Sequence, residues 1–451
     1  MFSAPVRDFK LLSVSSKSMV LMRKLLIVVC ALFFLYTQVR VVFEVFRPLA
    51  YPRWYILGDT ININDYFQYY KSAKLAYSDK AHKVYDPETQ FEFENELVKP
   101  LKSDKVYFSQ YPPIIFPLVY PLSLVEYNVG YTLWCIVQAA AGMLSLWLMA
   151  ASLGPLRRRE RIILMMGVMS TIPAYLGLWH GNVVFFMLAC FSLYVYGFMN
   201  NKNVVGGAAM AISAYKPQYA PIMLIPSFVK WRWKLFAAMI VLDVVLILIA
   251  GTIVGWDNII NYPKIVSDAE LKSAEFRGVN PHLMVCLRGV LTHFLPYESN
   301  FKAAAMIYFV SFVPLLVFWW KLRAVENKQL LLWALALTVV FDLIFCPHVH
   351  FHDSILLAIP AALTLPVVSP LQALKLPSVS ERIWCLILLL YPVYSWIINS
   401  SLHNTERGIE ASIFFAVHAV LLTAGVKRFS ELFKQSRSAE ATVKEAIREG
   451  D

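Results

Sequence analysis

The segment between Gly58 and Asp86 carries the residues of this chain that are best suited to acid–base chemistry. It follows the first long apolar run and contains Asp59 and Asp65, and a row of aromatic residues begins directly after Asp65. A carboxylate there can take the proton from an attacking hydroxyl group. An aspartate in an exposed loop often has no such role, but aromatic residues at helical spacing indicate a binding surface. We therefore predict Asp65 as a catalytic carboxylate, with Asp59 and Tyr69 as substrate-binding residues.

A lysine inside an apolar stretch is the second candidate. Lys216 lies in the middle of residues 204–229, which prolines interrupt. A lysine at membrane depth costs about 3 kcal/mol on an insertion scale unless it is paired. Two interpretations follow. Lys216 could bind a phosphate group of a substrate, or it could be structural, either paired with Asp243 or Asp342 or extended to the interface.

Three histidines alternate along the chain just before Asp353. His348, His350 and His352 could present their rings to a zinc ion. However, they lie in a turn between two predicted helices, and the nearby acids are only Asp342 and Asp353. We therefore predict no metal site, and we interpret the histidines as hydrogen-bond donors to a phosphate or a sugar hydroxyl.

Other polar residues lie in connections that should face the same side as Asp65. Arg288 could hold a phosphate, and Asn280 and His282 could hydrogen-bond a sugar. His180 and Asn182 occupy a short turn, where an interfacial aromatic belt is the alternative interpretation. Polar loops commonly contain residues of these types. These five are therefore candidate binding residues only because their connections should lie on the same side as Asp65.

The composition identifies the elements that must position these residues. The chain has 451 residues, of which 58% are hydrophobic and only 16% are charged. Repeated apolar runs of about 20 residues are typical of a polytopic helical membrane protein. The net charge of +11 suits basic cytoplasmic loops beside anionic lipid, and we predict no nucleic-acid partner. Most of the six cysteines lie in apolar runs, and none forms a C-x-x-C pair, so we predict neither disulfides nor metal ligands.

About ten apolar runs meet the length criterion for a spanning helix. We predict an all-α fold with about 10–12 transmembrane helices. Two further apolar stretches, 111–125 and 204–229, contain prolines and should be re-entrant or pairs of short helices. The ten predicted spans are 25–45, 127–151, 162–178, 183–199, 235–254, 303–320, 330–345, 354–368, 383–398 and 411–426.

Charge orients these spans. Basic connections such as 157–161 and 230–234 belong inside by the positive-inside rule. The long connections 46–110 and 255–302 are then outside, and helices over 65–77 and 87–98 should lie in the interface there. We predict one transmembrane domain over 1–429, with an uncleaved first span, and a short charged cytoplasmic helix over 430–451.

Several motifs in this order resemble those of glycosyltransferase family 87, which belongs to the GT-C superfamily of membrane glycosyltransferases. The resemblance covers most of residues 58–360. The motifs are DYFQYYKSA from Asp65 with VYD at 84–86, YPPI from Tyr111, HGN at 180–182 where the family often has Gly-Gln-x-Asn, the stretch from GGAA at 206–209 to YKP at 215–217, and HVHFHD at 348–353.

The resemblance implies a GT-C fold, a polyprenyl-phosphate sugar as donor, with mannose favoured, and a lipid or glycan acceptor. It also implies that the first-loop aspartate, Asp65, is the general base and that one of the late histidines contacts the donor phosphate. Because the leaving phosphate carries its own charge, the reaction needs cations or hydrogen-bond donors more than a general acid. No cofactor is expected.

Three other functions remain open at this stage. A transporter or flippase would also have broken helices and an intramembrane lysine, but we find no inverted repeat. A polymerase or ligase acting on lipid-linked glycans would need large arginine-rich outer loops. A structural membrane subunit would explain neither Asp65 nor Lys216. The preferred placement is the inner (plasma) membrane, with the site on its periplasmic side.

Overall fold

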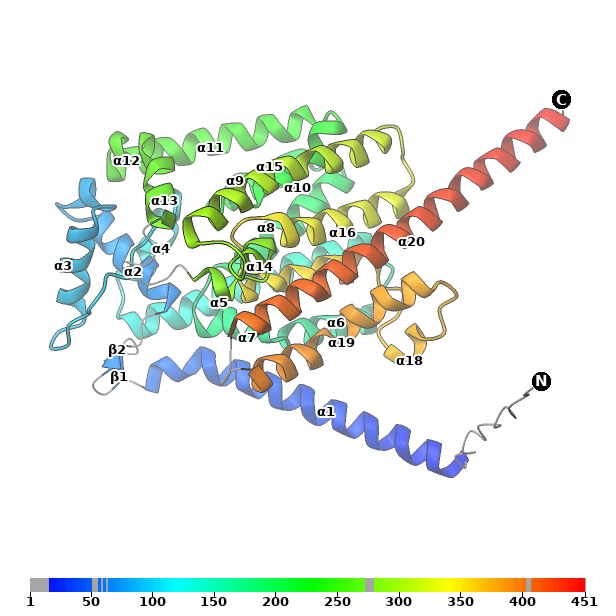
Figure 1. Cartoon of the computed structure of the whole chain (residues 1–451), viewed down its shortest axis with the longest axis horizontal. Helices are drawn as coiled ribbons and strands as arrows, with labels where there is room; N and C mark the ends of the chain where they lie inside the picture. The colour runs from blue at the N-terminus through cyan, green and yellow to red at the C-terminus, as the bar shows by residue number, and fades with distance from the viewer. Residues whose placement is uncertain are drawn as a thin grey trace, which may run out of the picture.

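The computed structural model describes residues 16–50, 56–57, 60–61, 64–271, 280–402 and 407–450, and Asp59 lies outside these ranges. This part of the chain is a helical bundle, as predicted, with one antiparallel pair of two-residue strands, β1 (Ile56–Leu57) and β2 (Thr60–Ile61) (Figure 1). The helices, with 3-10 turns marked η, are α1 (Ser16–Phe46), η1 (Arg47–Ala50), α2 (Asp65–Ala76), η2 (Ala81–Lys83), α3 (Pro87–Leu97), η3 (Pro113–Ile115), α4 (Phe116–Ser123), α5 (Tyr127–Leu153), α6 (Arg158–Met169), α7 (Ile172–Trp179), α8 (Val184–Met199), α9 (Asn203–Ser213), α10 (Ala220–Val229), α11 (Trp233–Val254), α12 (Trp256–Ile260), α13 (Tyr262–Leu271), η4 (Pro281–Leu283), α14 (Leu287–Leu291), α15 (Tyr297–Lys321), α16 (Lys328–Phe345), η5 (Phe351–Leu357), α17 (Ala358–Thr364), α18 (Pro370–Ala373), α19 (Val379–Leu402) and α20 (Arg407–Gly450).

Seven helices of the described chain are long and apolar enough to cross a membrane. They are α1, α5, α11, α15, α16, α19 and α20. The pair α6–α7, bent by 56°, would make an eighth span. The prediction of about 10–12 spans also counted apolar segments that form shorter helices, such as the 16-residue α8. A helix needs about 20 residues to span the hydrocarbon layer, and α8 is instead buried over most of its length inside the bundle.

The proline-broken stretch 204–229 forms two short helices, α9 and α10, as one of the predicted alternatives had it. The guanidinium group of Arg232, just after α10, donates a hydrogen bond to the side chain of Asn201, just before α9. The two ends of the pair therefore lie at the same end of the bundle, which is the geometry of a re-entrant segment. Lys216 lies in the turn between the two helices, at the deepest point of this excursion.

The other proline-broken stretch, 111–125, packs beside the outer-loop helix α2. Its two ends contact the same part of the chain, because Tyr85 Oη donates to the Tyr111 carbonyl oxygen at 2.6 Å and Tyr70 Oη donates to the Val125 carbonyl oxygen at 3.5 Å. Between them, the Tyr120 ring stacks on the Tyr77 ring with 3.6 Å between centroids. This segment therefore stays at one end of the bundle.

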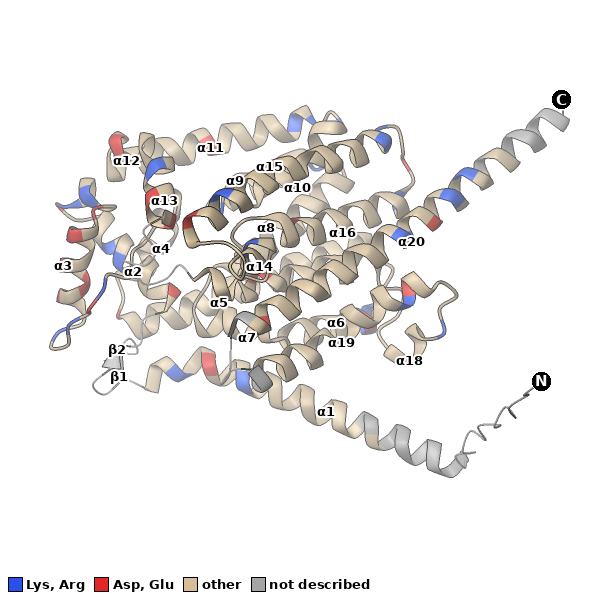
Figure 2. Cartoon of the chain, viewed as in Figure 1, with Lys and Arg blue, Asp and Glu red and all other residues tan. Residues whose placement is uncertain are grey.

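The two helices predicted in the first outer loop are present as α2 and α3, with Pro87 in the first turn of α3 and Asp86 capping it through the Thr89 amide. They lie at the same end of the bundle as α12 and α13 (Figure 1). Charged residues gather at the two ends of the bundle and are sparse along most of the long helices (Figure 2). Such a distribution is typical of a membrane protein.

The C-terminal segment differs from the prediction of a separate short helix after residue 429. The helix α20 runs without a break from Arg407 to Gly450. Its last part projects beyond the neighbouring helices, at the same end of the bundle as the start of α1 (Figure 1). No turn residue interrupts 427–434, so the apolar span continues into the charged tail as one helix.

Candidate active site

Asp65 is the first residue of α2. The preceding residue, Asn64, caps the helix, because its side-chain oxygen accepts a 3.0 Å hydrogen bond from the Phe67 amide. The same oxygen accepts a 2.9 Å hydrogen bond from the hydroxyl of Tyr127, at the start of α5. An asparagine at this position fixes where the helix begins. The local sequence and α5 together therefore set the position of the Asp65 carboxylate.

Each oxygen of the Asp65 carboxylate accepts one hydrogen bond from a neutral donor. Tyr107 Oη donates to Oδ1 at 2.9 Å, and Asn182 Nδ2 donates to Oδ2 at 2.6 Å. Asp65 is only partly buried, whereas Asn182 is 3% exposed. A carboxylate oxygen has two lone-pair sites, so this arrangement orients the group and leaves capacity to accept a further proton.

The turn that supplies Asn182 is held against α2. The Tyr66 amide donates to the carbonyl oxygen of His180 at 3.1 Å, and Trp134 Nε1 donates to the carbonyl oxygen of Gly181 at 2.7 Å. Gly181 has a φ of +62°, a left-handed conformation that glycine adopts without penalty. The turn between α7 and α8 and the start of α2 are thus one packed unit, as their predicted common placement requires.

Lys216 completes a connected series of side chains. Its Nζ lies 2.6 Å from Asp353 Oδ1 and 3.5 Å from Asn182 Oδ1. The structural partners proposed from the sequence, Asp243 and Asp342, are wrong, because the ammonium group pairs with Asp353. The amide of Asn182 bridges Lys216 and Asp65, so the re-entrant turn and the first outer loop meet at one place.

The late histidines form a row beside this ion pair. The ring centroids of His348 and His350 are 4.8 Å apart, and those of His350 and His352 are 5.6 Å apart. His352 Nε2 lies 3.9 Å from Asp353 Oδ2, and the His352 and His180 ring centroids are 6.5 Å apart. Burial, with His348, His352 and Lys216 nearby, holds the pKa of His350 well below its usual range, so this ring is neutral.

A neutral histidine can donate one hydrogen bond and accept another. In the part of the chain that the structure describes, no group of three His, Cys, Asp or Glu side chains is arranged to hold a metal ion. The three rings can act as hydrogen-bond donors and acceptors.

Arg288 belongs to a second cluster, next to His348. Its Nη1 lies 2.7 Å from Glu270 Oε2, and the other carboxylate oxygen, Oε1, lies 3.0 Å from His348 Nδ1. Burial opposes the ionisation of Glu270, but His348 and Arg288 outweigh it and lower the Glu270 pKa to about 2. The Arg288 side chain also contacts Asn300 and Tyr297. Arg288 therefore orients Glu270 and, through it, His348.

Glu270 and Tyr107 were not predicted from the sequence. Glu270 lies in α13 two residues after Asp268, and acids among the polar residues of a predicted loop give no signal. Tyr107 is one of many tyrosines, and its role depends on a contact with Asp65 across 42 positions. Neither residue has a local pattern that could have singled it out.

Asn280 and His282 lie at the exposed rim of the second outer loop. His282 makes only a loose ring contact with His293, with 6.5 Å between centroids. A backbone bridge between Met284 and His350 joins the loop to the histidine row. The loop is therefore attached to the site, but these two side chains are not brought to Asp65.

Tyr69 corrects the expectation of an accessible aromatic surface. It is fully buried, with its ring 4.6 Å from the Tyr111 ring and 5.7 Å from Trp134. Tyr66 and Phe67 are fully buried as well. These rings pack α2 onto α5, because burying large aromatic side chains is strongly favourable. They position Asp65 and do not form a surface open to a substrate.

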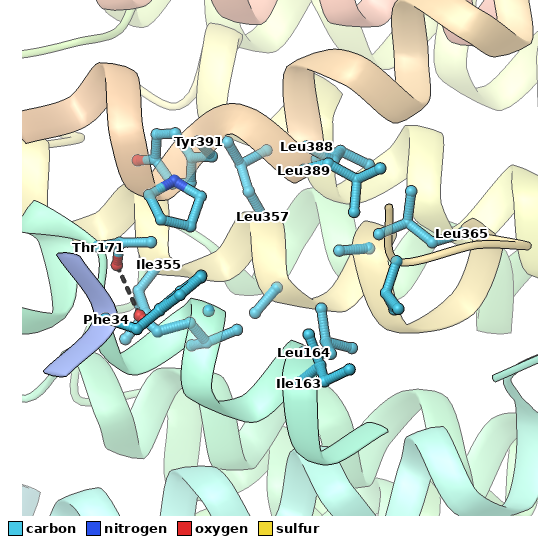
Figure 3. A pocket seen from close by; sticks show the side chains of 16 residues that line it. Phe34, Ile163, Leu164, Thr171, Ile355, Leu357, Leu365, Leu388, Leu389 and Tyr391 are labelled. Atoms are coloured by element: carbon cyan, nitrogen blue, oxygen red, sulfur yellow. Dashed lines mark hydrogen bonds between the residues drawn. The ribbon is translucent and has the colours of Figure 1, made fainter. Parts of the chain in front are cut away.

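An apolar cavity is lined in part by η5, the turn that also carries Asp353. Ile355 and Leu357, which follow Asp353 by two and four residues, line it together with side chains of α1, α6, α17 and α19. Figure 3 shows Phe34, Leu164 and Leu389 around this space, with Thr171 and Tyr391 as its polar-tipped residues. It is thus an apolar space between helices that reach membrane depth.

A family model described as glycosyltransferase family 87 matches residues 108–347, which is more than half of the chain. No curated protein matches the chain. The matched region contains Asn182, Lys216 and Arg288, whereas Asp65 and Asp353 lie outside it.

Proposed function

We propose a specific reaction for this chain, which belongs to glycosyltransferase family 87 and is a membrane glycosyltransferase. The enzyme moves a hexose or pentose, with mannose favoured, from a polyprenyl-phosphate donor to a hydroxyl group of a lipid or glycan acceptor. The single observation that carries this proposal is the connected series Asp65–Asn182–Lys216–Asp353. It places a carboxylate and a cation on opposite sides of one amide.

In this reaction Asp65 acts as the general base. The acceptor hydroxyl gives its proton to the Asp65 carboxylate while its oxygen attacks the anomeric carbon of the donor. The bond between that carbon and the phosphate oxygen breaks, and polyprenyl phosphate leaves with the electron pair. A positioned base of this kind contributes about 10²–10⁴-fold to a rate.

The leaving phosphate would be stabilised by Lys216 and the histidine row. Lys216 brings a positive charge, and His350 and His352 bring neutral N–H groups. A preorganised cation and hydrogen-bond donors aimed at developing charge are the usual means of stabilising such a leaving group. Since Asp353 holds Lys216 in place, the ammonium group does not have to be ordered during the reaction.

The apolar cavity suits the lipid part of the donor. It is lined by residues of α1 and α19, which are long enough to span the bilayer, and by Ile355 and Leu357 of η5, the turn that also carries Asp353. A donor whose phosphate lies at Lys216 would therefore have an apolar space available for its first isoprenoid units. We place this site on the periplasmic side of the inner membrane, because the connections at the other end carry the basic clusters.

The test compares wild type with Asp65→Asn in membranes supplied with labelled polyprenyl-phosphate sugars and lipid or glycan acceptors. We expect sugar transfer by Asp65→Asn to fall about 10²–10⁴-fold. Asp79→Asn is the matched control, because Asp79 is an exposed aspartate of the same outer segment. Full transfer activity of Asp65→Asn would refute the general-base role.

The alternative function, transport of a lipid-linked glycan or a small solute without transfer chemistry, is favoured by the re-entrant pair α9–α10 and the lysine at its turn. An assay in the same membranes distinguishes transport from sugar transfer. Movement of an unmodified substrate across the membrane without formation of a glycosylated product would support the transporter.

A further inference from the structure

A fully buried ion pair in the first outer loop joins α2 to α3. Lys71 Nζ is 2.9 Å from Glu94 Oε2, and both side chains are completely buried. Burial lowers the pKa of Lys71, and Glu94 opposes this effect. Removing two charges from water is costly, and such a pair is often no more stabilising than apolar residues of similar size. The pair is therefore poorly explained as a device for stability alone.

The buried pair holds both backbone polar groups of one residue, Tyr107. Lys71 Nζ donates to the Tyr107 carbonyl oxygen at 2.7 Å, and the Tyr107 amide donates to Glu94 Oε2 at 3.0 Å. The residues that follow are held in the same way. Gln68 Nε2 donates to the Phe108 carbonyl oxygen at 3.2 Å.

Gln90 makes two such hydrogen bonds, with the amide and the carbonyl oxygen of Ser109, at 2.9 Å and 3.2 Å. Buried backbone groups need partners. Here side chains of α2 and α3 provide the partners that a neighbouring strand would provide in a sheet.

We propose that Tyr107 is a positioning residue for the Asp65 carboxylate and that the Lys71–Glu94 pair is the clamp that sets the Tyr107 hydroxyl. This inference rests on the proposed function of Asp65. The hydroxyl donates to Asp65 Oδ1 at 2.9 Å, and Lys71 lies on the same helix as Asp65, six residues further on. The clamp thus fixes the position of the Tyr107 hydroxyl relative to α2, the helix that carries Asp65.

The consequence is a fixed carboxylate plane. Tyr107 holds Oδ1 and Asn182 holds Oδ2, so the group cannot turn about its Cβ–Cγ bond without losing both hydrogen bonds. Burial raises the pKa of Tyr107 well above its usual value. The phenol therefore stays protonated and acts as a hydrogen-bond donor. The proton of the acceptor substrate's hydroxyl group then goes to Asp65 alone. Misplacing a catalytic group by about 1 Å can cost about 10²-fold in rate.

The first test is Tyr107→Phe, which removes only the hydroxyl. We expect kcat to fall about 10–100-fold with the KM of donor and acceptor changed by less than about twofold, because orientation and not binding is lost. Tyr85→Phe is the matched control. Its buried hydroxyl donates to the backbone of the neighbouring Tyr111 but does not contact Asp65, so its kcat should stay at the wild-type value. Wild-type kcat in Tyr107→Phe would overturn the inference.

The second test addresses the clamp with the double variant Lys71→Met/Glu94→Gln. It removes both charges at similar side-chain volume, and we expect it to fold, because replacing a whole buried pair is often neutral. Its kcat should fall like that of Tyr107→Phe, and combining the two changes should give no further loss, since both act through one hydroxyl. A folded double variant with wild-type kcat would overturn the clamp, while Tyr107→Phe still tests the positioning role.

Failure of this inference is distinguishable from failure of the proposed function. If Asp65→Asn retains full transfer, the base itself is refuted. If Asp65→Asn loses transfer but Tyr107→Phe does not, only the positioning role is refuted. In the Asp65→Asn background, Tyr107→Phe should leave the residual rate unchanged, because the carboxylate that it orients is already absent.

Discussion

At the scale of single residues, Asn182 is the point on which the site depends. Its amide nitrogen donates to Asp65 and its amide oxygen faces Lys216. Among uncharged short side chains, an amide offers both donor and acceptor atoms in one fixed plane. An aspartate at this position would repel Asp65. The residue type at 182 therefore explains how a base and a cation can be held close without pairing directly with each other.

Lys216 carries the first prediction at this scale. Lys216→Met leaves the Asp353 carboxylate buried without its cation, so we expect a loss of stability on the order of 3–5 kcal/mol. Lys216→Met/Asp353→Asn removes both charges and should recover most of that stability. If Lys216 binds the phosphate, the double variant should still show a donor KM raised at least about tenfold.

The measurements are the melting temperature in detergent and the transfer rate against donor concentration. A folded double variant with wild-type donor KM and wild-type kcat would show that the lysine is purely structural. A lowered kcat with unchanged donor KM would mean that Lys216 acts in the transition state, as a group that stabilises the leaving phosphate does, and not in ground-state binding of the donor.

At the scale of elements, short helices and tight turns bring the site together. The re-entrant pair α9–α10 delivers Lys216 to the interior, and η5 delivers the histidine row and Asp353. The turn between α7 and α8 brings Asn182 to Lys216 and contacts α2. Irregular backbone at membrane depth is tolerated where it is buried in protein or lines a cavity, and all three segments meet at one place.

Gly181→Ala carries the prediction at this scale. A Cβ atom at Gly181 would lie 2.6 Å from the Tyr66 Cβ and 3.1 Å from a ring carbon of Tyr131, and its φ is +62°. We expect a loss of about 2–4 kcal/mol from strain and overpacking together. Because Tyr66 follows Asp65 directly, kcat should fall as well.

Gly255→Ala is the matched control. Gly255 also has a positive φ, +86°, but nothing lies within 4 Å of an added Cβ. It should lose only the free energy of backbone strain, about 1–3 kcal/mol because φ +86° with ψ 148° is nearly confined to glycine, and it should keep its kcat. Equal loss of kcat in the two variants would contradict the contact between the 180–182 turn and α2 as the cause.

At the scale of the whole molecule, the two ends of the bundle are built from different elements. One end holds α2, α3, α12 and α13, and the other holds both ends of the α9–α10 pair and the projecting part of α20 (Figure 1). The seven long apolar helices separate these ends by the thickness of a bilayer. In the proposed reaction, the acceptor reaches the site from one side of the membrane and the donor reaches it from the lipid.

Cysteine labelling tests this arrangement. We expect single cysteines at Asp79 and at Lys375 to react with a membrane-impermeant maleimide from opposite sides. Cysteines at Lys202 and Lys234 should both react from the Lys375 side, because the α9–α10 pair is re-entrant. A Cys30→Ser background removes the exposed native thiol, and the other five cysteines are buried. Labelling of 202 and 234 from opposite sides would contradict re-entry.

The sequence by itself determined the local features of this protein. Apolar runs indicated the helical membrane fold, proline placement indicated the two broken stretches, and the pattern of residues 65–77 predicted a helix that begins at Asp65. Residue type also singled out Asp65, Lys216 and the late histidines. These signals are local, because hydrophobic period, capping and turn chemistry act over a few neighbouring residues.

Only the tertiary structure decided the contacts between these features. It showed that Lys216 pairs with Asp353, 137 positions away, that Tyr107 orients Asp65, and that the aromatic residues after Asp65 are packing and not a surface. It also showed fewer long spans than the ten apolar runs suggested, because helices such as α8 are short and bury their apolar side chains against protein. Apolarity does not distinguish lipid from protein as the surroundings, and the pairing of distant polar groups depends on how whole helices pack.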